Sequence, residues 1–276
     1  MATKREGQSM NVTQPGSGVS VRWLNPVGFD AYDAPIAGLL NSIKQADTQI
    51  EVVSFEMNAT PTHLEYRAYE ALMTRNIVEC TRDAAQQGID AMVIGCFYDP
   101  ALEDAREISG ETVVVAPCLS CLTVAAQLAN RFSILVGRHK WINQMNERVR
   151  HYGMQHQLAS FRSLGMSVDD FQRDHGVTRG RIIDEARRAV KDDHAEAIVL
   201  GCTIEFGFFE EVQQAVGVPV IDAVVAPFKH AEHLAQLKRQ FGWKPSRVGS
   251  CEPPPEEEMR RFGLFQAPAR LARAAG

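Results

Sequence analysis

The sequence predicts an α/β protein of two pseudosymmetric lobes, each a parallel sheet flanked by helices, with an active site in the cleft between them. Short apolar runs such as 91–94 and 197–200 alternate with amphipathic stretches, a pattern typical of buried parallel strands joined by helices. The octet 89–96 also matches 195–202 without a gap, at an offset of 106 residues that pairs further positions on both sides. A duplicated chain of this kind is expected to fold into two similar halves.

In the first half, strands are predicted where apolar residues run continuously, and helices where apolar residues recur every three or four positions. The first long helix is expected to end before Gly88, because glycine favours helix C-termini. Pro117 stops the last strand of this half. The predicted elements in order are strand 19–24, helix 34–44, strand 49–55, helix 65–87, strand 91–94, strand 112–116 and helix 119–129.

The second half repeats this alternation between its own strands and helices. The predicted elements are strand 132–136, helix 139–152, strand 156–163, helix 178–190, strand 197–200, strand 218–221 and helix 225–241.

The two ends of the chain differ from both halves. Residues 1–18 are polar and rich in Gly, Ser and Thr, and are predicted to be a disordered tail. After the proline- and glutamate-rich linker 253–258, one short amphipathic helix is predicted over 259–274, as a solvated extension or an oligomer contact.

Composition restricts the function. The chain has 276 residues, 45% of them apolar and 23% charged, with a net charge of −5. It therefore has no basic excess for nucleic acid or an anionic membrane. No apolar run approaches the roughly 20 residues that span a bilayer, and the N-terminus has no apolar core typical of a signal peptide. A cytoplasmic location and six reduced cysteines are expected.

Two of these cysteines occupy matched positions. Cys96 and Cys202 each follow a glycine at the carboxyl end of a buried strand, where ligands of parallel sheets gather. A helix start next to each thiol is expected to lower its pKa towards neutrality. A thiolate facing a thiol suits a reaction that removes a proton from one face of a carbon and returns one to the other. A lone cysteine at a strand end is usually a small buried hydrophobe, so it is the duplication that favours catalysis.

The neighbours of the two cysteines differ, because Phe97 follows one and Thr203 follows the other. The Cys-x-x-Cys pair that begins at Cys118 has no second cysteine or histidine pair for zinc, so it is interpreted as helix-start filler, although Cys118 can still line the cleft. No metal site is predicted, and the glycine-rich nucleotide motifs are absent from the sequence.

Several segments carry a resemblance to a known family. They are Leu24-Asn25-Pro26, Gly95-Cys96-Phe97-Tyr98-Asp99-Pro100, Leu200-Gly201-Cys202-Thr203 and Val218-Pro219-Val220-Ile221-Asp222. Through them, residues 19–242 resemble the aspartate/glutamate/hydantoin racemase superfamily, closest to its hydantoin and allantoin racemase branch. The Gly-Cys-Phe-x-Asp-Pro motif is fairly specific to that branch, whereas Gly-Cys-Thr is shared more widely.

The resemblance implies a racemase or epimerase that needs no cofactor and no metal. By motif, Cys96 and Cys202 would be its acid/base pair. Asn25 would bind the polar edge of the substrate, helped by the backbone N–H groups of Phe97 and Thr203. The substrate would be a small molecule, most simply a hydantoin or ureide ring such as a 5-substituted hydantoin or allantoin. A homo-oligomer is expected.

The resemblance also implies interleaved lobes. Lobe 1 would contain 19–118 and 223–242, lobe 2 would contain 119–222, and 243–276 would be a C-terminal extension.

One segment departs from the family. Pro117 and Cys118 stand where hydantoin racemases typically continue Gly-Ile-x-Glu-Ala, and because that segment borders the cleft, both residues are predicted to lie at the substrate site. The substrate's side chain therefore stays open. Retention of both cysteines disfavours an arylmalonate decarboxylase. The alternatives are an aspartate or glutamate racemase, a maleate-type cis–trans isomerase with one nucleophilic cysteine, and a non-catalytic small-molecule binding protein.

Overall fold

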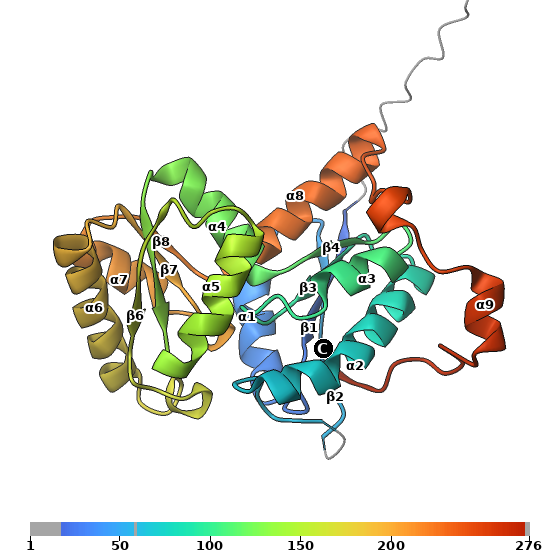
Figure 1. The fold of residues 1–276 in the computed structure, drawn as a ribbon, viewed down its shortest axis with the longest axis horizontal. Helices are drawn as coiled ribbons and strands as arrows, with labels where there is room; N and C mark the ends of the chain where they lie inside the picture. Colours follow the sequence, from blue (N-terminus) through green and yellow to red (C-terminus); the bar gives the residue numbers. More distant parts are fainter. Residues whose placement is uncertain (1–17, 58–59, 274–276) are drawn as a thin grey trace, which may run out of the picture.

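Two β-sheets form the framework of the protein (Figure 1). The computed structural model describes residues 18–57 and 60–273. The first sheet has the order β4-β3-β1-β2-β9 and the second the order β6-β5-β7-β8. Their strands are β1 (Ser20–Asn25), β2 (Gln49–Phe55), β3 (Ala91–Ile94), β4 (Val113–Val115), β5 (Phe132–Val136), β6 (Leu158–Ser163), β7 (Ala197–Leu200), β8 (Val220–Ile221) and β9 (Leu271–Arg273).

The sheets repeat one another. The four strands β4-β3-β1-β2 have the same order in space as β8-β7-β5-β6, and every pairing within these two sets is parallel. The matched strands are both internal: β3 lies between β4 and β1, and β7 lies between β8 and β5. The prediction of an α/β fold with two similar parallel sheets is confirmed.

Helices cover both faces of each sheet. They are α1 (Asp33–Ile43), α2 (Arg67–Gln86), α3 (Leu102–Ile108), α4 (Pro117–Leu128), α5 (Ile142–His151), α6 (His175–Asp192), α7 (Phe209–Val216) and α8 (Val225–Phe241). The short helices α3 and α7 were absent from the sequence prediction. Each has two turns, too few for apolar spacing to separate a helix from a loop.

Alternation along β3 shows how the first sheet is buried. Met92 and Ile94 pack into a core with side chains of α2 and α3, whereas Ala91 and Val93 pack into a core with side chains of α1 and α8. The last helices of the two halves are exchanged: α8 packs on β3 and β4 of the first sheet, and α4 packs on β7 and β8 of the second (Figure 1). Each half of the chain thus supplies a helix to the sheet of the other half.

The C-terminal segment corrects the sequence prediction. A single helix over 259–274 is wrong within the described residues, because the chain forms α9 (Glu256–Arg261) and then β9, antiparallel to β2. Gly263 and Phe265 have positive φ angles of 69° and 55°, which a continuous helix does not allow. Pairing with β9 covers the edge of β2, whose backbone groups are otherwise open.

The predicted disordered tail, 1–18, lies outside the described residues apart from Gly18. Across the described part of the chain, no helix combines the length and the apolar character that crossing a membrane requires.

Candidate active site

Both glycine–cysteine pairs sit where a strand passes close to its neighbour. The Gly95 N–H donates to the Leu24 carbonyl at 2.7 Å, and the Gly201 N–H donates to the Leu135 carbonyl at 2.8 Å. A Cβ added to Gly95 would lie 2.8 Å from the Leu24 oxygen, and one added to Gly201 would overlap the Leu135 oxygen. Only glycine fits at these two matched positions, and each delivers the next side chain to the strand end.

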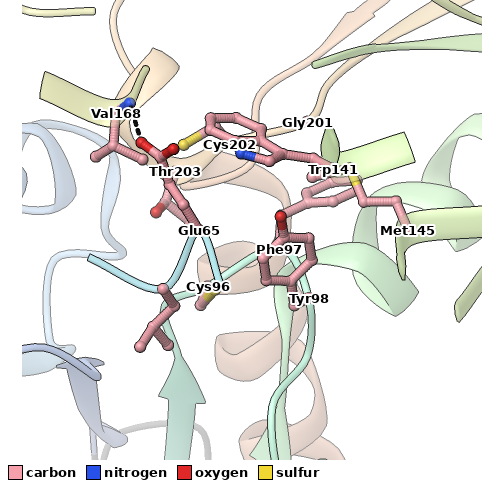
Figure 2. Close-up of a pocket in the computed structure, with 11 residues that line it drawn as sticks. Glu65, Cys96, Phe97, Tyr98, Trp141, Met145, Val168, Gly201, Cys202 and Thr203 are labelled. Atoms are coloured by element: carbon pink, nitrogen blue, oxygen red, sulfur yellow. Dashed lines mark hydrogen bonds between the residues drawn. The ribbon is translucent and has the colours of Figure 1, made fainter. Parts of the chain in front are cut away.

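The two cysteines face a common cavity. Figure 2 shows the sulfur atoms of Cys96 and Cys202 on opposite sides of it, with the Glu65 side chain between them. Both cysteines line two adjoining hollows of about 50 and 70 Å³. Tyr98 and Trp141 line the first hollow. Aromatic and apolar side chains, including Phe29 and Tyr32, line the second.

The thiols are less acidic than the sequence suggested. Burial raises the pKa of Cys96 to about 12 and that of Cys202 well above its usual range. Neither thiol stands at the start of a regular α-helix, because α3 begins only at Leu102 and a single 3₁₀ turn follows Cys202. The backbone N–H groups of Tyr98 and Ile204, at matched positions, stabilise the thiolates but do not offset burial. The expectation of a lowered thiol pKa is therefore wrong for this structure.

A carboxyl group lies three residues after each cysteine. Asp99 is fully buried and accepts hydrogen bonds from the backbone N–H groups of Cys118 at 2.7 Å and Leu119 at 2.9 Å, and from the Tyr152 hydroxyl at 2.7 Å. These three donors hold Asp99 at a φ of 49°, in the left-handed region that aspartate tolerates better than most residues other than glycine. Burial nevertheless raises the Asp99 pKa to about 6.

The matched carboxyl group, Glu205, has a different environment. It is fully buried, and neither of its oxygens has a hydrogen-bond partner among residues 18–57 and 60–273. Burial raises its pKa well above the usual range, and the neighbouring Asp222 adds to this shift. Burial therefore favours the neutral form of Glu205 more than it would for an exposed glutamate, and any negative charge on Glu205 raises the pKa of Cys202 further.

The sequence-predicted substrate residues fall into two groups. Asn25, Phe97 and Thr203 line the hollows beside the cysteines. Pro117 and Cys118 are not among the lining residues; they are buried at the start of α4.

Two side chains of the first group already have partners. The Asn25 side-chain oxygen accepts from the Trp23 indole N–H at 2.7 Å, and the Asn25 side-chain NH2 group donates to Asp33, so both bonds fix the orientation of this amide. The Thr203 hydroxyl donates to the Gly95 carbonyl at 3.1 Å, so it links the two halves across the site.

Sequence reasoning did not identify Glu65, Tyr98 or Trp141 as site residues. Glu65 accepts from the Val168 N–H at 2.9 Å and from the Arg138 guanidinium at 2.7 Å, which ties the segment before α2 to the second half of the chain (Figure 2). Tyr98 lies within the Gly-Cys-Phe-x-Asp-Pro motif quoted above, and Glu65 is the first residue of the predicted helix 65–87, whereas no sequence signal marks Trp141. No cluster of three metal-binding side chains occurs in the described part of the chain.

Comparison with known proteins agrees with this arrangement. The profile described as Asp/Glu/Hydantoin racemase matches residues 36–231. The hydantoin racemase of Pseudomonas sp. strain NS671 is 34% identical over 252 residues, covering 90% of this chain and 98% of that protein. The allantoin racemase from Klebsiella pneumoniae has a structure with a TM-score of 0.80 at 27% identity, covering 87% of this chain and 95% of that one.

More distant structures share the fold alone. The maleate isomerase from Pseudomonas putida S16 has a TM-score of 0.60 at 17% identity, covering 85% of this chain and 97% of that one. The protein is thus an α/β protein of two similar halves, each of which places one thiol at a shared cavity. The chain belongs to the Asp/Glu/hydantoin racemase family.

Proposed function

We propose that the protein is a cofactor-independent racemase or epimerase for a hydantoin or ureide ring, with Cys96 and Cys202 as its acid/base pair. The observation that carries this proposal is the placement of the two thiols on opposite sides of one cavity. Relatives that are hydantoin racemases support the substrate class.

The reaction follows from the two faces of the cavity. One cysteine, as thiolate, removes the proton from the carbon next to a ring carbonyl, and the C–H electron pair moves onto the carbonyl oxygen as an enolate. The opposite thiol then gives its proton to the other face of the same carbon. The product is the mirror-image centre, and thiol and thiolate have exchanged places. Conversion of the second enantiomer runs through the same steps in reverse.

The charges around the cavity favour a neutral ring over a free carboxylate. Among the described residues, neither hollow is lined by Lys or Arg, and the one acidic lining residue is Glu65. An aspartate, glutamate or maleate carboxylate would enter this apolar cavity without a cationic lining residue to pair with it, which is costly. This argument disfavours the amino-acid racemase and maleate isomerase alternatives.

The test is hydrogen exchange in deuterated water with separated enantiomers of a 5-substituted hydantoin. The wild-type chain should racemise both enantiomers and exchange the α-hydrogen of each. Cys96→Ser and Cys202→Ser should each lose racemisation by about 100- to 10,000-fold, because a positioned acid or base is missing. Each variant should still exchange one enantiomer without inverting it, and the favoured enantiomer should differ between the two.

Cys251→Ser is the matched control, because Cys251 lies in a 3₁₀ turn of the C-terminal segment and lines neither hollow. Near-native racemisation by both single variants would refute the two-thiol mechanism. A stable thioether adduct after incubation with maleate would favour the isomerase. Ligand binding without any exchange would favour the non-catalytic binding protein.

A further inference from the structure

Two buried donors in the first hollow are without partners. The Tyr98 hydroxyl and the Trp141 indole N–H have no hydrogen-bond partner among the described residues, although their side chains are only 4% and 3% exposed. Both residues line the hollow that holds Cys96 and Cys202, and the Tyr98 hydroxyl points to the side of the cavity where Trp141 lies (Figure 2). A buried polar group without a partner costs free energy. Two such donors at one cavity therefore indicate that a ligand binds there with a hydrogen-bond acceptor between them.

Packing holds each donor in place. A Cβ added to Gly137 would lie 2.5 Å from the Trp141 ring, so the indole occupies space that only glycine leaves. The Phe171 ring packs against the indole at a centroid distance of 6.3 Å and an interplanar angle of 53°. Tyr98 precedes Asp99, whose three hydrogen bonds fix the turn after Cys96. The two groups are therefore preorganised donors.

The chemistry of the pair selects its ligand atom. An indole N–H can only donate, and burial raises the pKa of the Tyr98 phenol above its usual value, so that it keeps its proton. Two neutral donors without a lining cation suit a neutral oxygen acceptor better than a carboxylate.

We propose that Tyr98 and Trp141 donate hydrogen bonds to the ring carbonyl oxygen adjacent to the reacting carbon, an inference that rests on the proposed racemase function. When a thiolate removes the α-proton, the C–H electron pair moves onto this oxygen. The two hydrogen bonds strengthen as negative charge develops there, and neither donor gives up its proton.

This role differs from that of the thiols in one measurable way. The enolate is the same intermediate for both enantiomers, so the donors act equally in both directions. Each thiol, by contrast, reaches one face of the carbon. Loss of a donor should slow the exchange of both enantiomers by the same factor. Loss of a thiol should instead slow the exchange of one enantiomer much more than that of the other.

The experiment uses Tyr98→Phe and Trp141→Phe in the full chain, since both retain an aromatic ring in the cavity wall. For a 5-substituted hydantoin, α-hydrogen exchange at saturating substrate should fall about 100-fold in each variant, equally for the two enantiomers. KM should change much less than kcat. Trp243→Phe is the control, because Trp243 is 67% exposed and lines neither hollow.

A sulfur analogue locates the oxygen. Sulfur is a weaker hydrogen-bond acceptor than oxygen, so the effect of Tyr98→Phe should shrink for a ring with a thiocarbonyl at the adjacent position. Unchanged exchange in both variants, unequal slowing of the two enantiomers, or an undiminished effect on the thio analogue would each overturn the donor role. An inactive wild-type chain would instead refute the racemase function itself.

Discussion

At the scale of single residues, the two glycines before the cysteines show how the repeat constrains the site. A methyl group on Gly201 would overlap the Leu135 carbonyl oxygen, whereas a methyl group on Gly180 in α6 would meet no atom within 4 Å. We expect Gly201→Ala to destabilise the protein by about 1–3 kcal/mol, the usual cost of overpacking, and to lower activity by moving Cys202. Gly180→Ala should be neutral or slightly stabilising. Denaturant unfolding of both variants measures the contrast.

The raised thiol pKa values set the expected pH dependence of the rate. In the proposed mechanism the base is a thiolate, and burial raises the pKa of both thiols, to about 12 for Cys96 and well above the usual range for Cys202. After correction for substrate ionisation, kcat/KM should therefore rise about tenfold per pH unit between about pH 7 and 9. A plateau over that range would mean that the working thiolate forms at a much lower pKa.

Asp99 adds a pH dependence to stability. Its folded-state pKa of about 6 lies above the ordinary 3.8, so the folded protein holds this proton more tightly than the unfolded chain. The resulting stabilisation, about 3 kcal/mol in full, is present below about pH 3.8 and is lost as pH rises through 6. Urea unfolding of wild type and Asp99→Asn between pH 4 and 7 should show the wild-type advantage shrinking with pH. A wild-type advantage that grows with pH would contradict this assignment.

At the scale of elements, the C-terminal strand β9 supports a part of the chain that leads to the active site. It pairs with the last residues of β2. The N–H of Glu56, the residue that follows β2, donates to the Arg270 carbonyl at 3.4 Å. The chain after β2 then leads to His63 and Glu65 in the cavity wall. The terminal strand therefore supports the base of a segment that lines the site.

Truncation before β9 tests this support. A chain ending at Phe262 should lose about 0.5–3 kcal/mol of stability and bind substrate more weakly, because the edge of β2 is uncovered. A chain ending at Arg273 retains β9 and is the control. Thermal unfolding and KM should be measured on both. Equal values would show that β9 contributes nothing to either property.

The elements that the sequence predicted well are those with strong local patterns. The buried strands β3, β5 and β7 have the predicted bounds, because each is a short and almost wholly apolar run that begins after a charged residue and ends before a glycine, a pattern typical of a covered strand. The pairing of β9 was not predictable, because three residues carry no alternation and their partner lies more than 200 positions earlier.

At the scale of the whole molecule, the sequence predicted only part of the candidate site. The two thiols follow from the repeat, but Tyr98 and Trp141 come together only when both halves fold, and no repeat or motif marks Trp141. The low acidity of the thiols depends on burial, which a linear sequence does not specify. Homo-oligomer formation, a cytoplasmic location and the lobe boundaries remain predictions from the sequence.

The exchanged helices predict how the molecule behaves when divided. A cut between Leu128 and Phe132 separates α4 from the second sheet, which it covers. Neither fragment alone should unfold cooperatively, because each leaves one apolar sheet face open to water. Mixed together, the fragments should recover a cooperative transition and racemase activity. Independent cooperative folding of either fragment would contradict this dependence.

The same exchange has an evolutionary consequence. A single ancestral repeat with this arrangement would have left one face of its own sheet uncovered. Two copies would have covered each other's sheets by exchanging their last helices, as in a domain-swapped homodimer. Such a dimer would have carried two identical thiols on a true symmetry axis. Fusion of two copies into one chain would release them from identity, and matched positions such as 97 and 203, or 99 and 205, could then differ as they do here. An asymmetric substrate can then bind in one orientation between two thiols that began as the same residue.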